Sequence, residues 1–142
     1  FDAPPDPAFY ASLFRVRALM DEPMVELAAL HRTAEHVRLL KYWCHQMENA
    51  GDSVEQFGLA CLEVHLVMAD AGHDMLLRSV IGVVELTLAL ALTRNTAMDG
   101  VAYRHRSAEL YIRLTSAIEG GMPDEAIAVL GECRSLDKQQ AY

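Results

Sequence analysis

Apolar side chains recur every three or four positions along most of this 142-residue chain, and the runs are separated by glycines or short polar segments. This spacing gathers apolar side chains on one face of a helix, which must then be buried against other helices. No stretch shows the sustained apolar–polar alternation of a half-buried strand, and no Asn-Gly or Asp-Gly turn lies between β-branched runs. The sequence therefore predicts an all-α fold, an antiparallel bundle of six or seven helices.

Residues typical of helix ends mark the boundaries. Thr33, Ser53 and Asp74 are placed as N-caps, and Pro123 suits the first position of a last helix. Pro23 removes a backbone donor and crowds the preceding turn, so we expect a kink or a new helix there. The predicted helices cover about 7–20 with a further segment to 30, 33–51, 54–71, 75–93, 101–119 and a stretch from 123 onward.

One domain, residues 8–136, is the simplest division of a chain of this length. Residues 1–7 (FDAPPDP) are expected to be the remnant of a stiff, proline-rich linker, and the polar residues 137–142 a frayed tail. The first residue is Phe1, and it begins no basic segment followed by an apolar run, as a signal peptide would. We therefore expect that an upstream part of the protein has been removed.

Charge and motif content exclude several function classes. The 20 acidic and 12 basic residues give a net charge of −8, which disfavours direct binding of nucleic acid by this chain. The apolar stretch 75–92 contains Arg78 and Glu85, each costly in a bilayer, so we expect no membrane span. A glycine-rich phosphate loop, a Gly-x-Ser-x-Gly elbow and a His-Glu-x-x-His motif are all lacking, so we do not expect an enzyme.

Cysteine content indicates the compartment. Cys44, Cys61 and Cys133 are too few and too scattered to form a disulfide framework. A reducing cytoplasm is therefore the expected location.

Three segments in order carry a resemblance to a known family. The first segment has Arg17 and Asp21, four residues apart, before the run 26–33 (ELAALHRT). The second is the run 61–65 (CLEVH), which a turn connects to a pair of leucines. The third, residues 111–133, contains an Ala-Ile pair, a double glycine and an alanine-containing helix. In this order and over nearly the whole chain, they resemble the FCD domain, the C-terminal effector-binding domain of GntR-family transcription regulators of the FadR subfamily.

The resemblance implies a bacterial regulatory domain that forms a homodimer and binds a small effector, often a carboxylate, in a central cavity of the bundle. DNA would be bound only by an N-terminal winged helix-turn-helix, which this chain lacks. The apolar excess of the segment 75–92 also favours homodimerisation. The alternative is a structural dimerisation module without an effector. A ligand-sized cavity would support the first reading, and a filled core would support the second.

Many members of the family hold a divalent metal with an Asp and three His. At those positions this chain has Cys61, His65, Tyr111 and Cys133. Only His65 keeps the residue type that the family has at its position. Two thiolates and an imidazole suit zinc, with Tyr111 or water as the fourth ligand. Because three ligands differ, loss or redesign of the metal site is the favoured reading, with these residues as core. A redox switch pairing Cys61 with Cys133 is a further alternative, which requires an accessible, low-pKa thiol.

Two arginines complete the candidate effector site. The resemblance places Arg17 at a position that can face the cavity, where its planar fork would suit a carboxylate. Arg94 is a candidate of the same kind. For both, a surface position on a helix is the alternative.

Overall fold

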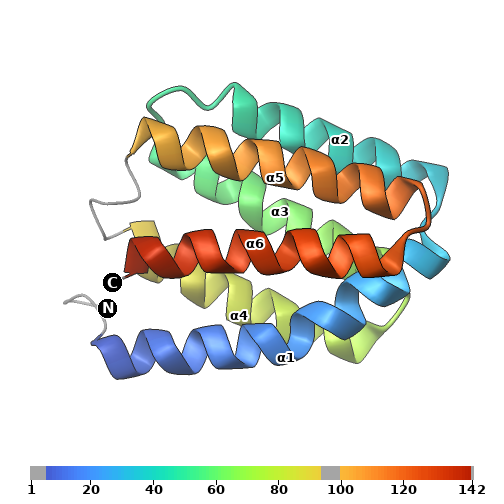
Figure 1. The fold of residues 1–142 in the computed structure, drawn as a ribbon, viewed down its shortest axis with the longest axis horizontal. Coiled ribbons are helices and arrows are strands. Elements are labelled where there is room, and N and C mark those ends of the chain that lie inside the picture. Colours follow the sequence, from blue (N-terminus) through green and yellow to red (C-terminus); the bar gives the residue numbers. More distant parts are fainter. Residues whose placement is uncertain (1–5, 94–99, 142) are drawn as a thin grey trace.

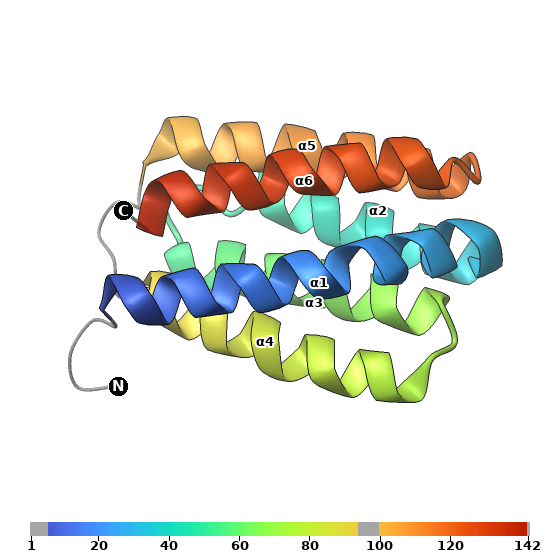
Figure 2. The same cartoon turned by 60° about the horizontal axis from the view of Figure 1, so that its bottom comes forward.

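The computed structural model describes residues 6–93 and 100–141, which form six α-helices with no strand among them. The helices lie in two layers: α1, α6 and α5 side by side in one, and α4, α3 and α2 in the other (Figures 1 and 2). Helix α1 begins and α6 ends at the same end of the bundle (Figure 1). The all-α prediction is confirmed. The helices are α1 Pro7–His31, α2 Ala34–Glu48, α3 Val54–Ala71, α4 Met75–Thr93, α5 Val101–Glu119 and α6 Pro123–Ala141.

Side-chain caps fix most helix starts where the sequence predicts them. The Thr33 side chain accepts a hydrogen bond from the His36 amide at the start of α2. Ser53 Oγ accepts from the Gln56 amide, 3.1 Å away, and Asp74 Oδ1 accepts from the Leu77 amide, 2.9 Å away. Each cap satisfies one of the backbone donors that a first helical turn leaves unpaired.

Two predicted helix ends differ in the structure. Helix α1 continues through Pro23 to His31, so of the two alternatives at the proline, a kink or a new helix, the new helix does not form. Helix α6 extends through residues 137–140 to Ala141, where we expected a frayed tail. The physical reason is Asp137, which is 7% exposed because its carboxylate is bound inside the bundle.

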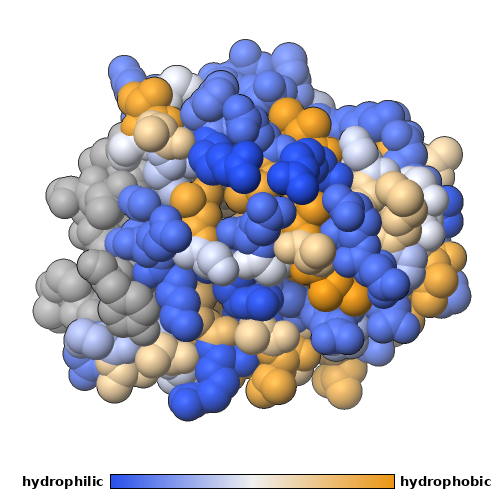
Figure 3. Space-filling view, in the orientation of Figure 1, coloured by the Kyte–Doolittle hydropathy of each residue, from blue (hydrophilic) through white to orange (hydrophobic). Residues whose placement is uncertain are grey.

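Helix α4 lies at the edge of the bundle, against α3 and α1 (Figure 2). Ile81, Val84 and Leu88 face inward and are buried, whereas Leu76 and Val83 are 77% and 68% exposed. Within the single chain, α4 is therefore buried on one face and leaves apolar side chains exposed on the other. No helix in the described ranges is long and apolar enough to cross a membrane. The face over α5 and α6 carries mainly hydrophilic side chains (Figure 3).

Candidate functional site

A fully buried arginine lies at the centre of the bundle. Arg17 of α1 is 0% exposed, and its Nη1 donates to Asp137 Oδ2 of α6 over 2.5 Å. Its Nε lies 3.1 Å from Glu85 Oε1 of α4, although neither of these two atoms makes a hydrogen bond. Both carboxylates are themselves buried. We call Arg17, Glu85 and Asp137, together with His65 and Tyr111, the ionic cluster.

The remaining nitrogen of Arg17 faces His65 and Tyr111. Arg17 Nη2 lies 3.2 Å from His65 Nε2 and 3.4 Å from the Tyr111 hydroxyl. A guanidinium only donates, so Nε2 must accept from it. The other ring nitrogen, Nδ1, lies 2.9 Å from the carbonyl oxygen of Cys61, which only accepts, so Nδ1 carries the proton. All three nitrogens of Arg17 therefore face partners within the protein, and His65 Nε2 also lies 3.6 Å from Glu85 Oε1.

The charge of Arg17 is retained despite its burial. Burial alone would lower the pKa of Arg17, but the carboxylates of Glu85 and Asp137 outweigh this and hold the pKa well above its usual value. A neighbouring pair joins α6 to α1: Arg134 Nη1 donates to Asp21 Oδ2 over 2.5 Å. Burial raises the pKa of Asp21, and the nearby charge of Arg17 opposes that rise.

A cavity of about 30 Å³ adjoins the ionic cluster. This volume holds one or two water molecules, because one water needs at least about 10–15 Å³ of such space. It is far below the roughly 300 Å³ of a small-molecule pocket. The lining residues come from α3, α4, α5 and α6, and they are Gly58, Cys61, Leu62, His65, Glu85, Leu88, Ala89, Tyr103, Tyr111 and Asp137.

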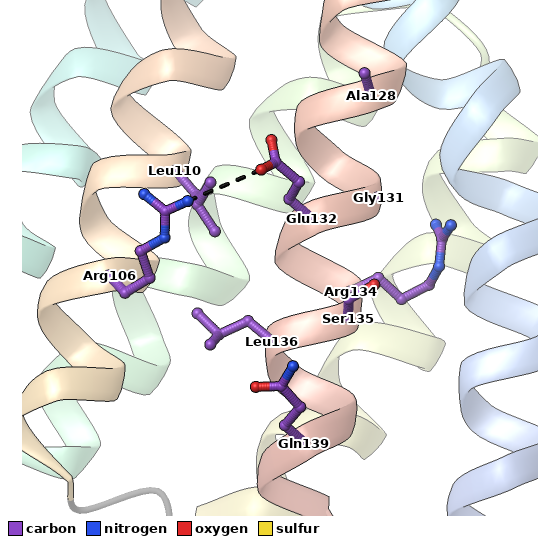
Figure 4. A pocket seen from close by; sticks show the side chains of 9 residues that line it. All are labelled: Arg106, Leu110, Ala128, Gly131, Glu132, Arg134, Ser135, Leu136 and Gln139. Carbon is purple, nitrogen blue, oxygen red and sulfur yellow. Dashed lines mark ion pairs between the residues drawn. The ribbon is translucent and has the colours of Figure 1, made fainter.

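Larger depressions lie at the surface. The groove between α5 and α6 measures about 630 Å³, and Arg106 and Glu132 face one another across it (Figure 4). Arg134 points away from this groove toward α1 (Figure 4), where it binds Asp21. The groove therefore has no contact with the centre of the ionic cluster.

The thiols near the cluster have the wrong chemistry for a redox switch. Burial raises the pKa of Cys61 and Cys133, and the negative charge of Asp137 raises both further. Raised pKa values keep both thiols protonated at neutral pH, whereas thiolates are the reactive form. The requirement for a low-pKa thiol is not met.

The side chains as placed do not fit a zinc ion. The Arg17 guanidinium lies against His65 Nε2, the nitrogen that a metal would require. Across residues 6–93 and 100–141, no three His, Cys, Asp or Glu side chains converge to hold a metal. A protein cation thus lies where the resemblance implies a metal ion, and the zinc site stays an untested prediction.

The structure brings together most of the residues singled out from the sequence. Cys61, His65 and Tyr111 line the cavity, Arg17 lies behind them, and Cys133 is buried nearby on α6. Arg94 lies outside the described residues.

Sequence reasoning missed three residues of the site: Glu85, Asp137 and Tyr103, whose hydroxyl donates to Asp137 Oδ1 over 2.6 Å. A lone carboxylate inside the apolar helix 75–93 was the available signal for Glu85. Nothing comparable singles out Asp137 within its polar segment.

Residues 12–134 match the model of the FCD domain family. The fold is similar to Streptococcus agalactiae GntR, with a TM-score of 0.76 and 19% sequence identity. That match covers 90% of this chain and 57% of the other, so the chain spans little more than half the length of that protein. No curated protein matches the sequence.

Proposed function

Since the chain belongs to the FCD domain family, the effector domains of GntR-type regulators, we propose that it is the effector-sensing and dimerisation domain of a FadR-type transcription regulator. The effector would enter at the cavity beside the ionic cluster. Operator DNA would be bound by a separate winged helix-turn-helix domain. The observation that carries the proposal is the cluster itself, because a buried set of charges is a weak source of stability and is typical of functional sites.

The contacts of the cluster suggest how an effector would act. Arg17 joins α1 to α4 through Glu85 and to α6 through Asp137. A ligand that binds one of these carboxylates must change its bond to Arg17, and with it the position of α1. Helix α1 is the first helix of the chain, so this movement would reach the side on which an N-terminal domain is attached. Effector binding would thus shift the population of helix arrangements.

A second candidate function is supported by the size of the cavity. About 30 Å³ is too little for a metabolite, and a filled core favours a structural dimerisation module. A thermal-shift screen of the 142-residue chain against carboxylates, sugars, amines and neutral metabolites separates the two. A saturable ligand whose effect is lost on altering a cavity residue supports effector sensing. No ligand of any class would overturn it in favour of the structural module.

Homodimerisation through α4 is the third part of the proposal. Leu76, Val80 and Val83 follow one another at four and three residues, the spacing of a coiled-coil seam, and all three are exposed. Within the described residues, α4 packs closely against α3 and α1 only, so this seam has no helix over it. We infer that α4 of a second copy covers it.

Val83→Glu is therefore expected to convert a dimer into a monomer. Two carboxylates would be buried in an apolar seam, which we expect to weaken association by at least about 100-fold. Light scattering after gel filtration measures the change. Met122→Glu is the matched control, because Met122 is also exposed and apolar but lies in the turn before α6. A wild-type monomer at high micromolar concentration would contradict the proposed interface.

A further inference from the structure

Helix α1 contains a proline in its interior. Pro23 has no amide proton, so the carbonyl oxygen of Leu19 receives no hydrogen bond from residue 23, and the proline ring crowds that carbonyl. Both residues lie on the outer side of the helix, where Leu19 is 67% exposed. The axis of α1 bends along its length (Figures 1 and 2), as an interior proline causes. The backbone of α1 is therefore weakest at Pro23.

The two halves of α1 are buried by different kinds of side chain. Before the proline, the buried residues are Tyr10, Phe14, Arg17 and Asp21. After it, they are Met24, Val25, Ala28 and Ala29, all with no exposed surface. Both buried charged residues of α1 thus lie before Pro23, and only apolar residues are buried after it.

The half after the proline, residues 24–31, is fixed by close packing. A Cβ atom on Gly72 would lie 2.9 Å from Leu27 Cβ, so α1 lies very near the end of α3. Arg32 follows directly after the helix and donates to the carbonyl oxygens of Ala29 and Glu119, which ties the end of α1 to the end of α5. Packing of this density leaves little room for displacement. We call residues 24–31 the anchor.

The half before the proline, residues 7–22, is held to α4 and α6 by ion pairs in addition to its two buried aromatic rings. Arg17 contacts Glu85 and Asp137, and Asp21 accepts from Arg134. Arg17 and Asp21 are four residues apart and so face the same side of α1. A buried ion pair adds little net stability, because the cost of removing its charges from water offsets their attraction. Water or a charged ligand can therefore replace these contacts more readily than the packing of the anchor.

We propose that Pro23 is a hinge and that residues 7–22 form a switch arm, which moves when Arg17 loses Asp137 or Glu85 while the anchor stays packed. This inference rests on the proposed effector-sensing function and names the part of the chain that moves. A hinge confines the change to the half that carries Arg17, whereas a rigid α1 would have to break the packing of both halves. Movement of the arm would also withdraw Arg17 from the centre of the bundle and so enlarge the space beside the cavity of about 30 Å³.

The test is native-state hydrogen exchange of the 142-residue chain, measured amide by amide and corrected for intrinsic exchange rates. We expect the amides of residues 11–22 to exchange at least about 10-fold faster than those of the anchor, with a step at Pro23. Pro23→Ala restores the missing backbone hydrogen bond and should reduce this ratio by about 2- to 10-fold. Glu26→Ala is the matched control, because Glu26 is also exposed on α1 but its replacement adds no backbone hydrogen bond. A gradual rise of exchange toward the start of α1 that Pro23→Ala leaves unchanged would indicate a frayed end and overturn the hinge.

Asp137→Asn tests whether the ion pair holds the arm. Exchange of the arm should rise by at least about 10-fold, as the loss of a charged hydrogen bond predicts. Glu132→Gln, which removes an exposed carboxylate from the same helix, should leave it nearly unchanged. If Asp137→Asn also leaves the arm unchanged, the ion pair does not hold it and the proposed switch is wrong. No ligand enters these measurements, so their failure leaves effector sensing standing, which only the ligand screen can overturn.

Discussion

Arg17→Ala is expected to lower the free energy of unfolding by about 3–5 kcal/mol, the range measured when one partner of a buried ion pair is removed. The substitution leaves the carboxylates of Glu85 and Asp137 buried near one another without their shared cation. It also removes the donor that faces His65 Nε2. Urea unfolding at pH 7 and 25 °C measures the loss, and a small domain with a total stability of about 5–15 kcal/mol shows it clearly.

Two controls separate charge from side-chain volume. Arg15→Ala removes the same side chain from an exposed position two residues earlier in α1, and its stability should equal that of the wild type. The triple variant Arg17→Met, Glu85→Gln, Asp137→Asn removes all three charges and keeps similar volumes. It should recover most of the loss, because apolar or neutral replacements of whole buried ionic groups are often tolerated. A loss below about 1 kcal/mol for Arg17→Ala would contradict the burial of the cluster.

The helix boundaries were predictable because they depend on short-range chemistry. The caps at Thr33 and Ser53 act on amides three residues away, so the sequence alone contains both partners. The same applies to the start of α6 at Pro123, where proline tolerates the loss of an amide that has no partner. Pro23 was less predictable, because packing of the flanking turns decides whether a helix continues through a proline.

The site was only partly predictable. Family resemblance singled out Arg17, Cys61, His65 and Tyr111, and the structure places them together. The partner of Arg17 that makes its shortest contact, Asp137, lies 120 residues further along the chain. A pairing over such a separation depends on how α1 and α6 pack. The buried ion pairs at the centre of the site therefore required the structure.

The small volume of the cavity and the proposed sensing role are compatible because Arg17 occupies the centre of the site. Arg17 binds carboxylates of α4 and α6 in place of a ligand, so the protein itself fills the site. An effector that binds Glu85 or Asp137 would then compete with an existing ion pair.

Removing residues 137–142 is expected to destabilise the domain by about 3 kcal/mol, although these residues look like a dispensable polar tail. The truncation deletes Asp137, and so leaves Arg17 with one carboxylate and Tyr103 without its acceptor. The effect should be smaller than that of Arg17→Ala, because Glu85 stays close to Arg17. Removing only residues 139–142 keeps Asp137 and should cost much less, since it shortens the final turn of α6.

Asp137→Asn tells the ion pair apart from the helix end, because it keeps the length of α6 and removes only the charge. In urea unfolding, this variant should have nearly the same free energy of unfolding as the longer truncation. Asparagine still accepts the hydrogen bond from the Tyr103 hydroxyl, but it no longer balances the charge of Arg17. If both truncations instead lose the same small amount, Asp137 contributes no more than a frayed end would. The free energy of unfolding of Asp137→Asn, compared with the values for the two truncations, therefore measures how much of the stability of α6 comes from the buried carboxylate.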